Sequence, residues 1–99
     1  MLKIDHREKN GDCRMTLTGQ LDSTTAVELD ETLQLILPKT ESLTIDCTRL
    51  AYVSSAGLRV LLSTSKTLSA RKGLVLTDLT DPVKHILEVT GMTGFFTIR

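Results

Sequence analysis

The sequence predicts a single α/β domain with a mostly parallel sheet, and three observations carry this prediction. Strand-like segments take turns with segments that repeat apolar residues at helical spacing along the 99 residues. The dipeptide Asn10-Gly11 between the first two strand-like segments is typical of a hairpin, since both residues tolerate a positive φ. A chain of this length can bury a core without disulfides or metals. We therefore expect one domain over residues 1–99 with the order β-β-α-β-α-β-α-β, parallel beyond the N-terminal antiparallel hairpin.

Two strands and a connection come first. Residues 2–7 are predicted as an edge strand, with Leu2 and Ile4 on one face. Residues 13–18 alternate apolar and polar side chains, as expected of a strand buried on one face. The segment Gly19–Ser23 then connects this strand to the first helix.

The first helix is predicted from apolar residues at helical spacing, and its start has two candidate caps. Asp22 or Ser23 can accept hydrogen bonds from the first backbone amides. Pro38 is expected to end the helix, because proline disfavours the α conformation in the residue before it. The apolar positions are Ala26, Leu29, Leu33 and Ile36.

A third strand over residues 43–47 leads through residues 48–54 into a central helix at about residues 56–71. The apolar stripe of this helix is strong, and it predicts burial against the sheet. Lys72-Gly73 is expected to end the helix, with a cation near the negative end of its dipole. The positions of the stripe are Leu58, Leu61, Leu62, Ser65 and Leu68.

The remaining elements are an apolar strand over residues 74–79, a short helix and a last strand over residues 95–98. Asp81-Pro82 predicts the start of the helix, because a cap followed by proline at the first helical position is favoured. Gly91 is expected to end it. Its inner face is formed by Val83, Ile86 and Leu87.

Composition excludes several classes of protein. Twelve basic and twelve acidic side chains give a formal net charge of zero, which argues against nucleic acid as a partner. No apolar run approaches the roughly 20 residues of a membrane helix, and the charged N-terminus does not resemble a signal peptide. We expect a cytoplasmic protein without membrane insertion. Cys13 and Cys47 continue apolar strand patterns and are expected to be buried free thiols, with no metal site and no cofactor.

The segment Ser54-Ser55-Ala56-Gly57 is the most informative part of the chain. Serines before a helix serve as caps, and the same position favours a phosphate because unpaired amides and the helix dipole attract anions. Both a capping role and a regulatory or catalytic role are therefore open. Asp22 is by default a cap or turn residue. Because loops after parallel strands gather at one sheet edge, we expect Asp22 and the two serines to share a surface.

Enzymatic activity is not expected. The chain contains no G-x-S-x-G elbow, no phosphate-binding P-loop and no G-x-G-x-x-G segment. Ser55 has no histidine near it in sequence that could activate it as a nucleophile.

The element order and three segments together resemble the STAS domain, the family of bacterial anti-sigma factor antagonists. The resemblance covers nearly the whole chain. It rests on Leu17–Asp22 at the end of the second strand, on Leu43–Leu62 across the central motif, and on Gly91–Ile98 at the end of the chain.

The resemblance implies a phosphorylation switch. In the family, a serine or threonine two residues before the motif's glycine is phosphorylated by a serine kinase that is also the anti-sigma factor. A PP2C-type phosphatase removes the phosphate. That position is Ser55 here, while the family's usual preceding aspartate is Ser54, which makes Ser54 a rival acceptor. The position of Ala56 holds a hydroxyl residue in the family.

The resemblance also implies a binding surface. Unphosphorylated, the protein would bind the ATP-binding kinase and so release a sigma factor. The expected contact residues are Gln20, Leu21, Asp22, Ser23, Ser54, Ser55, Ala56, Gly57 and Arg59. The alternative is a constitutive STAS subunit of an ABC-type lipid transport or sensory complex.

Overall fold

The computed structural model describes residues 1–99 and contains one five-stranded sheet in the order β1-β2-β3-β4-β5. Strand β1 (Leu2–Lys9) pairs antiparallel with β2 (Asp12–Leu21). Strands β3 (Ser42–Val53), β4 (Gly73–Thr77) and β5 (Thr97–Ile98) follow in parallel. The predicted order of elements and the mixed sheet are therefore confirmed.

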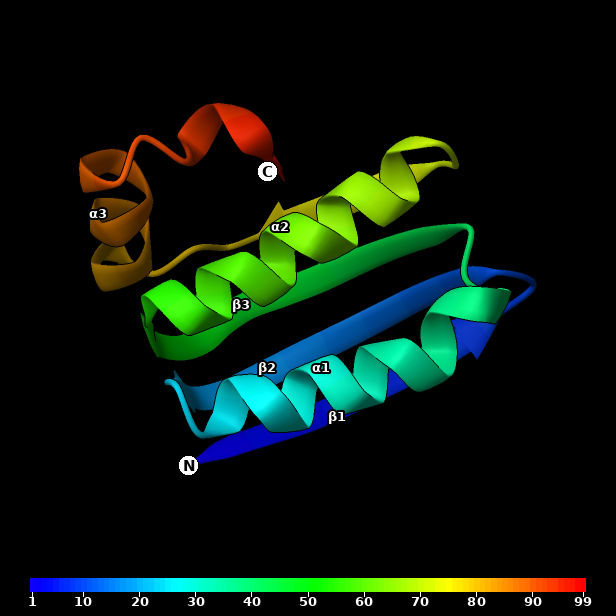
Figure 1. Cartoon of the computed structure of the whole chain (residues 1–99), viewed down its shortest axis with the longest axis horizontal. Helices are drawn as coiled ribbons and strands as arrows, with labels where there is room; N and C mark the ends of the chain where they lie inside the picture. Colours follow the sequence, from blue (N-terminus) through cyan, green and yellow to red (C-terminus); the bar gives the residue numbers. More distant parts are fainter.

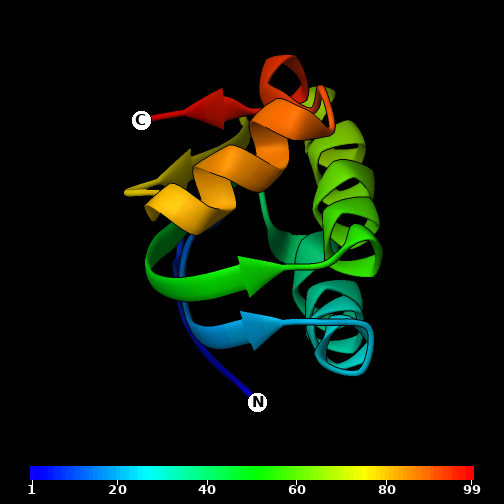
Figure 2. The same cartoon turned by 90° about the vertical axis from the view of Figure 1, so that its left-hand side faces the viewer.

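Three helices join the strands. Helices α1 (Thr25–Ile36) and α2 (Ser55–Ser69) lie side by side on one face of the sheet (Figure 1). The short helix α3 (Asp81–Val89) packs near the end of β3, and two 3₁₀ turns cover residues 37–39 and 93–95. Figure 2 shows that no helix covers the other face of the sheet, which we call the outer face. The fold is thus a two-layer α/β arrangement.

The hairpin and the core form as the sequence predicts. Asn10 and Gly11 adopt φ values of 53° and 88° between the paired ends of β1 and β2. The core lies between the sheet and the helices and includes Leu58, Leu61 and Leu68 of the predicted stripe, whereas Leu62 is only partly buried. The inward-facing residues of the central strands are Cys13, Met15, Leu17, Leu43, Ile45, Cys47, Leu74 and Leu76.

The two cysteines are free and buried, as predicted. Burial, with smaller contributions from Asp46 and Asp78, raises the pKa of Cys47 to about 12. Burial also raises the pKa of Cys13, with Glu8 as the smaller cause. Both thiols therefore stay neutral and act as small apolar side chains.

Several predicted boundaries were wrong. Strand β2 continues to Leu21 and β3 to Val53, where the sequence predicted ends at residues 18 and 47. The pairing of β2 with β3 shifts register after Thr16 and again after Gly19. Such bulges break the alternation of apolar and polar residues, so the sequence pattern of residues 48–53 did not predict a strand. Strands β2 and β3 therefore remain paired up to their last residues, Leu21 and Val53.

Smaller differences occur at the ends of other elements. Helix α2 ends at Ser69, and Arg71 lies beyond it, where its guanidinium donates hydrogen bonds to the carbonyls of Leu37 and Thr40. Strand β4 ends at Thr77 rather than residue 79, and β5 begins at Thr97 rather than residue 95. Phe95 belongs to a 3₁₀ turn, and its side chain is exposed.

Candidate functional site

The site is built where β2 and β3 end together. Leu21 and Val53 are the last paired residues of these strands, and the chain leaves both toward the helix layer. The backbone N–H of Ser54 donates a hydrogen bond of 2.8 Å to the carbonyl of Leu21, which extends the pairing by one residue. This bond brings the loop after β2, with Asp22, next to the N-terminus of α2.

Gly57 allows this close approach. A Cβ at position 57 would lie 2.6 Å from Cγ and 3.1 Å from the carbonyl oxygen of Leu21. Any side chain here would push the first turn of α2 away from the end of β2. The glycine of the motif is therefore required by packing, and it fixes the position of the two serines before it.

The two serines have different environments. Ser54 has extended torsions and caps α2: its Oγ accepts a hydrogen bond of 3.2 Å from the backbone N–H of Gly57, and the residue is partly buried. Ser55 is the first helical residue and is exposed, and its hydroxyl makes no hydrogen bond within the protein. Ser54 thus serves the fold, while Ser55 is accessible to another molecule.

Asp22 caps the first helix. Its Oδ1 accepts hydrogen bonds from the backbone N–H groups of Thr24 (3.0 Å) and Thr25 (2.9 Å). The backbone N–H of Asp22 donates in return to the Thr25 hydroxyl at 2.8 Å. The Thr25 backbone bond, and then its hydroxyl, hold the pKa of Asp22 below its usual range. Of the two predicted caps, only Asp22 accepts backbone hydrogen bonds here; it does so from two residues before Thr24, the formal N-cap position, whose own side chain makes no capping bond. Its Oδ2 is left without a hydrogen bond.

The first turn of α2 contains no acidic residue of its own. By contrast, the first turn of α1 contains Glu28 and that of α3 contains Asp81. Arg59 follows Ser55 by one helical turn and is exposed, so the two residues share one face of α2. This end of α2 is suited to an anion.

A shallow groove between α1 and α2 adjoins Ser55, and the sequence analysis did not predict it. It measures about 290 Å³ and is lined by Ser23, Ala26, Val27, Asp30, Ala56, Arg59 and Val60. Val27 is 57% exposed and lies off the face of α1 that is buried through Ala26, Leu29 and Leu33. In the sequence, the position of Val27 off the apolar stripe of α1 was the signal that could have indicated this groove. The groove itself forms only because α1 and α2 pack together.

The predicted contact residues divide into two groups. Leu21 and Gly57 are buried against each other, so they position the surface and do not offer side chains to a partner. Accessible side chains belong to Gln20, Ser23, Ser55 and Arg59, with Asp22, Ser54 and Ala56 nearby. Tyr52, which pairs with Gln20 at the end of β3, is 44% exposed and adds an aromatic ring that was not predicted as a contact residue.

The structure shows no cluster of metal-ligating side chains. None of its helices has the length and apolar character that crossing a membrane requires. The site therefore offers hydroxyl, carboxylate and guanidinium groups for recognition.

Comparisons with known proteins agree with this geometry. The family model described as "Mlab, STAS domain" matches residues 4–98. The anti-sigma-B factor antagonist of Listeria monocytogenes is 31% identical over 101 residues, which cover 99% of this chain and 89% of the relative. BtrV of Bordetella bronchiseptica, a candidate anti-sigma factor antagonist, is 37% identical over 84 residues, covering 83% of this chain and 72% of the relative.

Solved structures of the anti-sigma factor antagonist SpoIIAA of Bacillus have the same fold. The unphosphorylated form superposes with a TM-score of 0.80 and 16% identity, covering 100% of this chain and 88% of that one. The phosphorylated form gives a TM-score of 0.73 and 14% identity, covering 100% and 91%.

Proposed function

The chain belongs to the STAS domain family, and on this basis we propose that it is an anti-sigma factor antagonist controlled by phosphorylation of Ser55. Two sequence relatives carry anti-sigma factor antagonist in their names. SpoIIAA, which shares the fold, has been solved both with and without phosphate. The proposed partners are an ATP-binding serine kinase that is itself the anti-sigma factor, and a PP2C-type phosphatase.

One observation carries the assignment to Ser55. The hydroxyl of Ser54 is already used as a cap and is partly buried, whereas the Ser55 hydroxyl is exposed and unbonded. A kinase must bring the acceptor hydroxyl into line with the γ-phosphate of ATP, which requires an accessible side chain. Modifying Ser54 would instead remove the cap of α2.

The surroundings of Ser55 can accept a phosphate without loss of the fold. The N-terminus of a 15-residue helix favours an anion, and the first turn of α2 contains no acidic residue to repel it. Arg59, one turn later on the same face, can pair with a phosphate. Phosphorylation is therefore expected to change the surface charge and leave the core unchanged.

The added charge supplies the switch. A phosphate brings about −1.5 to −2 charge units near neutral pH. These charges would arise beside Asp22, because the Ser54–Leu21 hydrogen bond holds the two loops together. A kinase surface that is complementary to the neutral serine would then face a group with the wrong charge, which weakens binding and lets the anti-sigma factor capture its sigma factor again.

The alternative function is a constitutive STAS subunit of an ABC-type lipid transport or sensory complex. The description of the matched family model, which names Mlab, gives it one observation in favour. In that case the surface around Ser55 would bind its partner permanently. The two functions differ in whether Ser55 is ever modified.

Phosphate incorporation tests the proposed function. The wild-type chain and its variants are incubated with ATP and the anti-sigma serine kinases of the same organism, and the products are analysed by intact mass and phosphopeptide mapping. Wild type, Ser54→Ala and Ser63→Ala should each accept one phosphate, and Ser55→Ala should accept none. Ser63 is a suitable control because it is an exposed serine on the same helix. Phosphate on Ser54, or on no serine at all, would contradict the proposal.

A further inference from the structure

The outer face of the sheet carries ordered rows of charged side chains. Because β1, β2 and β3 are in register, Lys3, Thr18 and Arg49 form one row across the strands. The next row contains Asp5, Thr16 and Asp46, and the third contains Arg7, Arg14 and Thr44. No helix covers this face (Figure 2). These rows carry four cationic side chains and two anionic ones, an excess of positive charge on this face in a chain of zero net charge.

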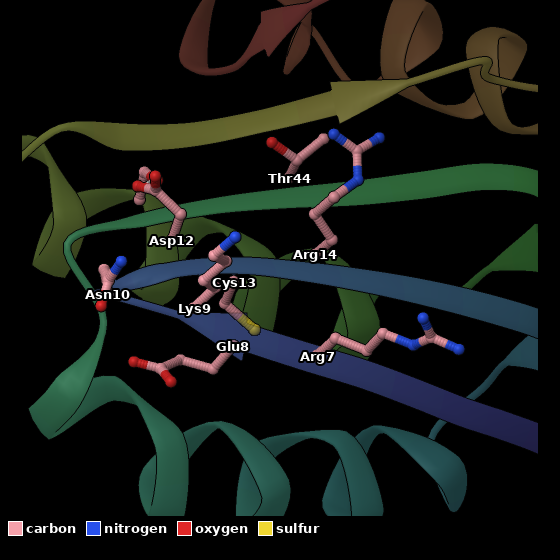
Figure 3. A pocket seen from close by; sticks show the side chains of 9 residues that line it. Arg7, Glu8, Lys9, Asn10, Asp12, Cys13, Arg14 and Thr44 are labelled. Atoms are coloured by element: carbon pink, nitrogen blue, oxygen red, sulfur yellow. Dashed lines mark hydrogen bonds between the residues drawn. The ribbon is translucent and has the colours of Figure 1, made fainter.

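Arg7 and Arg14 lie directly opposite each other in the antiparallel pair. Like charges at such positions destabilise a sheet. The only ion pair in the molecule joins Lys3 and Asp5 at 3.8 Å, so no carboxylate neutralises either arginine at close range. Figure 3 shows the two guanidinium groups pointing apart, that of Arg14 across β3 beside Thr44 and that of Arg7 along β1. The two guanidinium groups thus separate from each other, and only the more distant charge of Asp46 acts on Arg14.

Two polar hollows on the outer face meet at these arginines. The larger, of about 790 Å³, combines Arg7, Lys9 and Arg14 with the acidic residues Glu8 and Asp12. The smaller, of about 630 Å³, has four basic side chains and one acidic one, and no apolar residue lines it. We call it the cationic hollow; its residues are Lys3, Asp5, His6, Arg7, Arg14, Thr16, Thr18 and Arg49.

The acidic groups near the cationic hollow are already engaged. Asp5 is paired with Lys3. The Oδ1 atom of Asp46 accepts hydrogen bonds from the hydroxyl and the backbone N–H of Thr48. Arg7, Arg14 and Arg49 remain as exposed guanidinium groups without an ion-pair partner.

We propose that the cationic hollow binds a compact anion carrying several phosphate groups. Guanidinium forks bind phosphate oxygens through paired hydrogen bonds, and the hydroxyls of Thr16 and Thr18 on the floor can donate further ones. The lack of apolar lining disfavours a peptide anchor, which needs an apolar or aromatic pocket. The lining residues Arg14, Thr16 and Thr18 of β2 alternate with the core residues Cys13, Met15 and Leu17, so the hollow lies on the sheet face opposite the helices. This site is therefore separate from Ser55 and does not depend on the proposed switch.

Calorimetric titration of the full chain with inorganic tripolyphosphate tests this site. Arg14→Gln and Arg49→Gln should each weaken binding by about tenfold or more, because each removes a charge-assisted, potentially bidentate contact. Lys66→Gln is the matched control, since it removes one exposed cation from the last turn of α2, on the helix layer. Its affinity should stay within about twofold of wild type, as expected for a charge outside the site.

A second measurement guards against an effect on folding. Arg14→Gln should melt at the same or a higher temperature than wild type, because the Arg7–Arg14 repulsion is relieved. Tripolyphosphate should raise the melting temperature of wild type and of Lys66→Gln, but that of Arg14→Gln much less. Absence of binding at millimolar tripolyphosphate, or an equal loss of affinity in Lys66→Gln, would overturn the proposal. Tighter binding of a glutamate-rich peptide than of tripolyphosphate would also overturn it, because the ligand would then be an acidic protein segment.

Discussion

Gly57 lies directly against Leu21, so closely that a Cβ at position 57 would come within 2.6 Å of Leu21 Cγ. This contact joins the end of β2 to the first turn of α2. It sets the positions of Asp22 and Ser55, which belong to segments far apart in the sequence. The shape of the candidate site therefore depends on a buried glycine that has no side chain to offer a partner.

Gly57→Ala is expected to destabilise the protein by about 1–3 kcal/mol, the usual cost of overpacking a tight contact. The clash involves the carbonyl oxygen of Leu21 as well as its side chain, so rotation of Leu21 cannot relieve it. Urea unfolding measures the effect. Gly94→Ala is the control, because nothing lies within 4 Å of a Cβ at that position. Equal stability of Gly57→Ala and wild type would contradict the packing described here.

Leu61→Ala should cost about 2–5 kcal/mol, since it leaves a cavity in the core between α2 and the sheet. Leu61 is 3% exposed. Leu35→Ala makes the same chemical change on the solvent face of α1, where the side chain is 79% exposed, and should alter the free energy of unfolding by about 0.5 kcal/mol or less. Similar urea midpoints for the two variants would show that α2 does not pack as described.

Asp22 should stabilise the fold in a pH-dependent way. Its folded-state pKa is depressed by hydrogen bonds from Thr25, so its contribution is present above the ordinary aspartate pKa of about 3.9 and is lost as the pH falls through the lower folded value. The melting temperature of Asp22→Ala should thus lie a few degrees below wild type near neutral pH and approach it in acid. A difference that does not change between neutral and acidic pH would show that the carboxylate is not the group responsible.

The variant Asp22→Asn separates the hydrogen-bonding role of the Asp22 side chain from its negative charge. The amide keeps an oxygen that can accept from Thr24 and Thr25, so the variant should retain most of the stability at neutral pH. If Asp22 also contacts the kinase, Asp22→Asn should bind the kinase more weakly while remaining folded. Unchanged affinity in calorimetry would remove Asp22 from the proposed binding surface.

Much of this architecture could be predicted because local signals agree with the fold. Asn10-Gly11 specified the hairpin, and the leucine stripe of α2 specified its buried face. The full length of β3 could not be predicted, because the register shifts against β2 interrupt its alternation. The groove beside Ser55 depends on how α1 and α2 pack together, which no local pattern encodes.

The different environments of the two serines could not be predicted from the sequence. The spacing of Ser54, Ser55 and Gly57 placed two hydroxyls at a helix start, and either could have been the cap. Only the three-dimensional arrangement shows that Ser54 bonds the Gly57 amide and that Ser55 remains exposed.

The most direct test of the central claim is the affinity of the anti-sigma kinase for the protein with and without phosphate on Ser55, measured by titration calorimetry. The unphosphorylated protein and Ser55→Ala should bind equally well. The phosphorylated protein should bind at least about tenfold more weakly, which corresponds to about 1.4 kcal/mol, and Ser55→Asp should lie between them because a carboxylate carries less charge. Equal affinities for the phosphorylated and unphosphorylated forms would contradict the account.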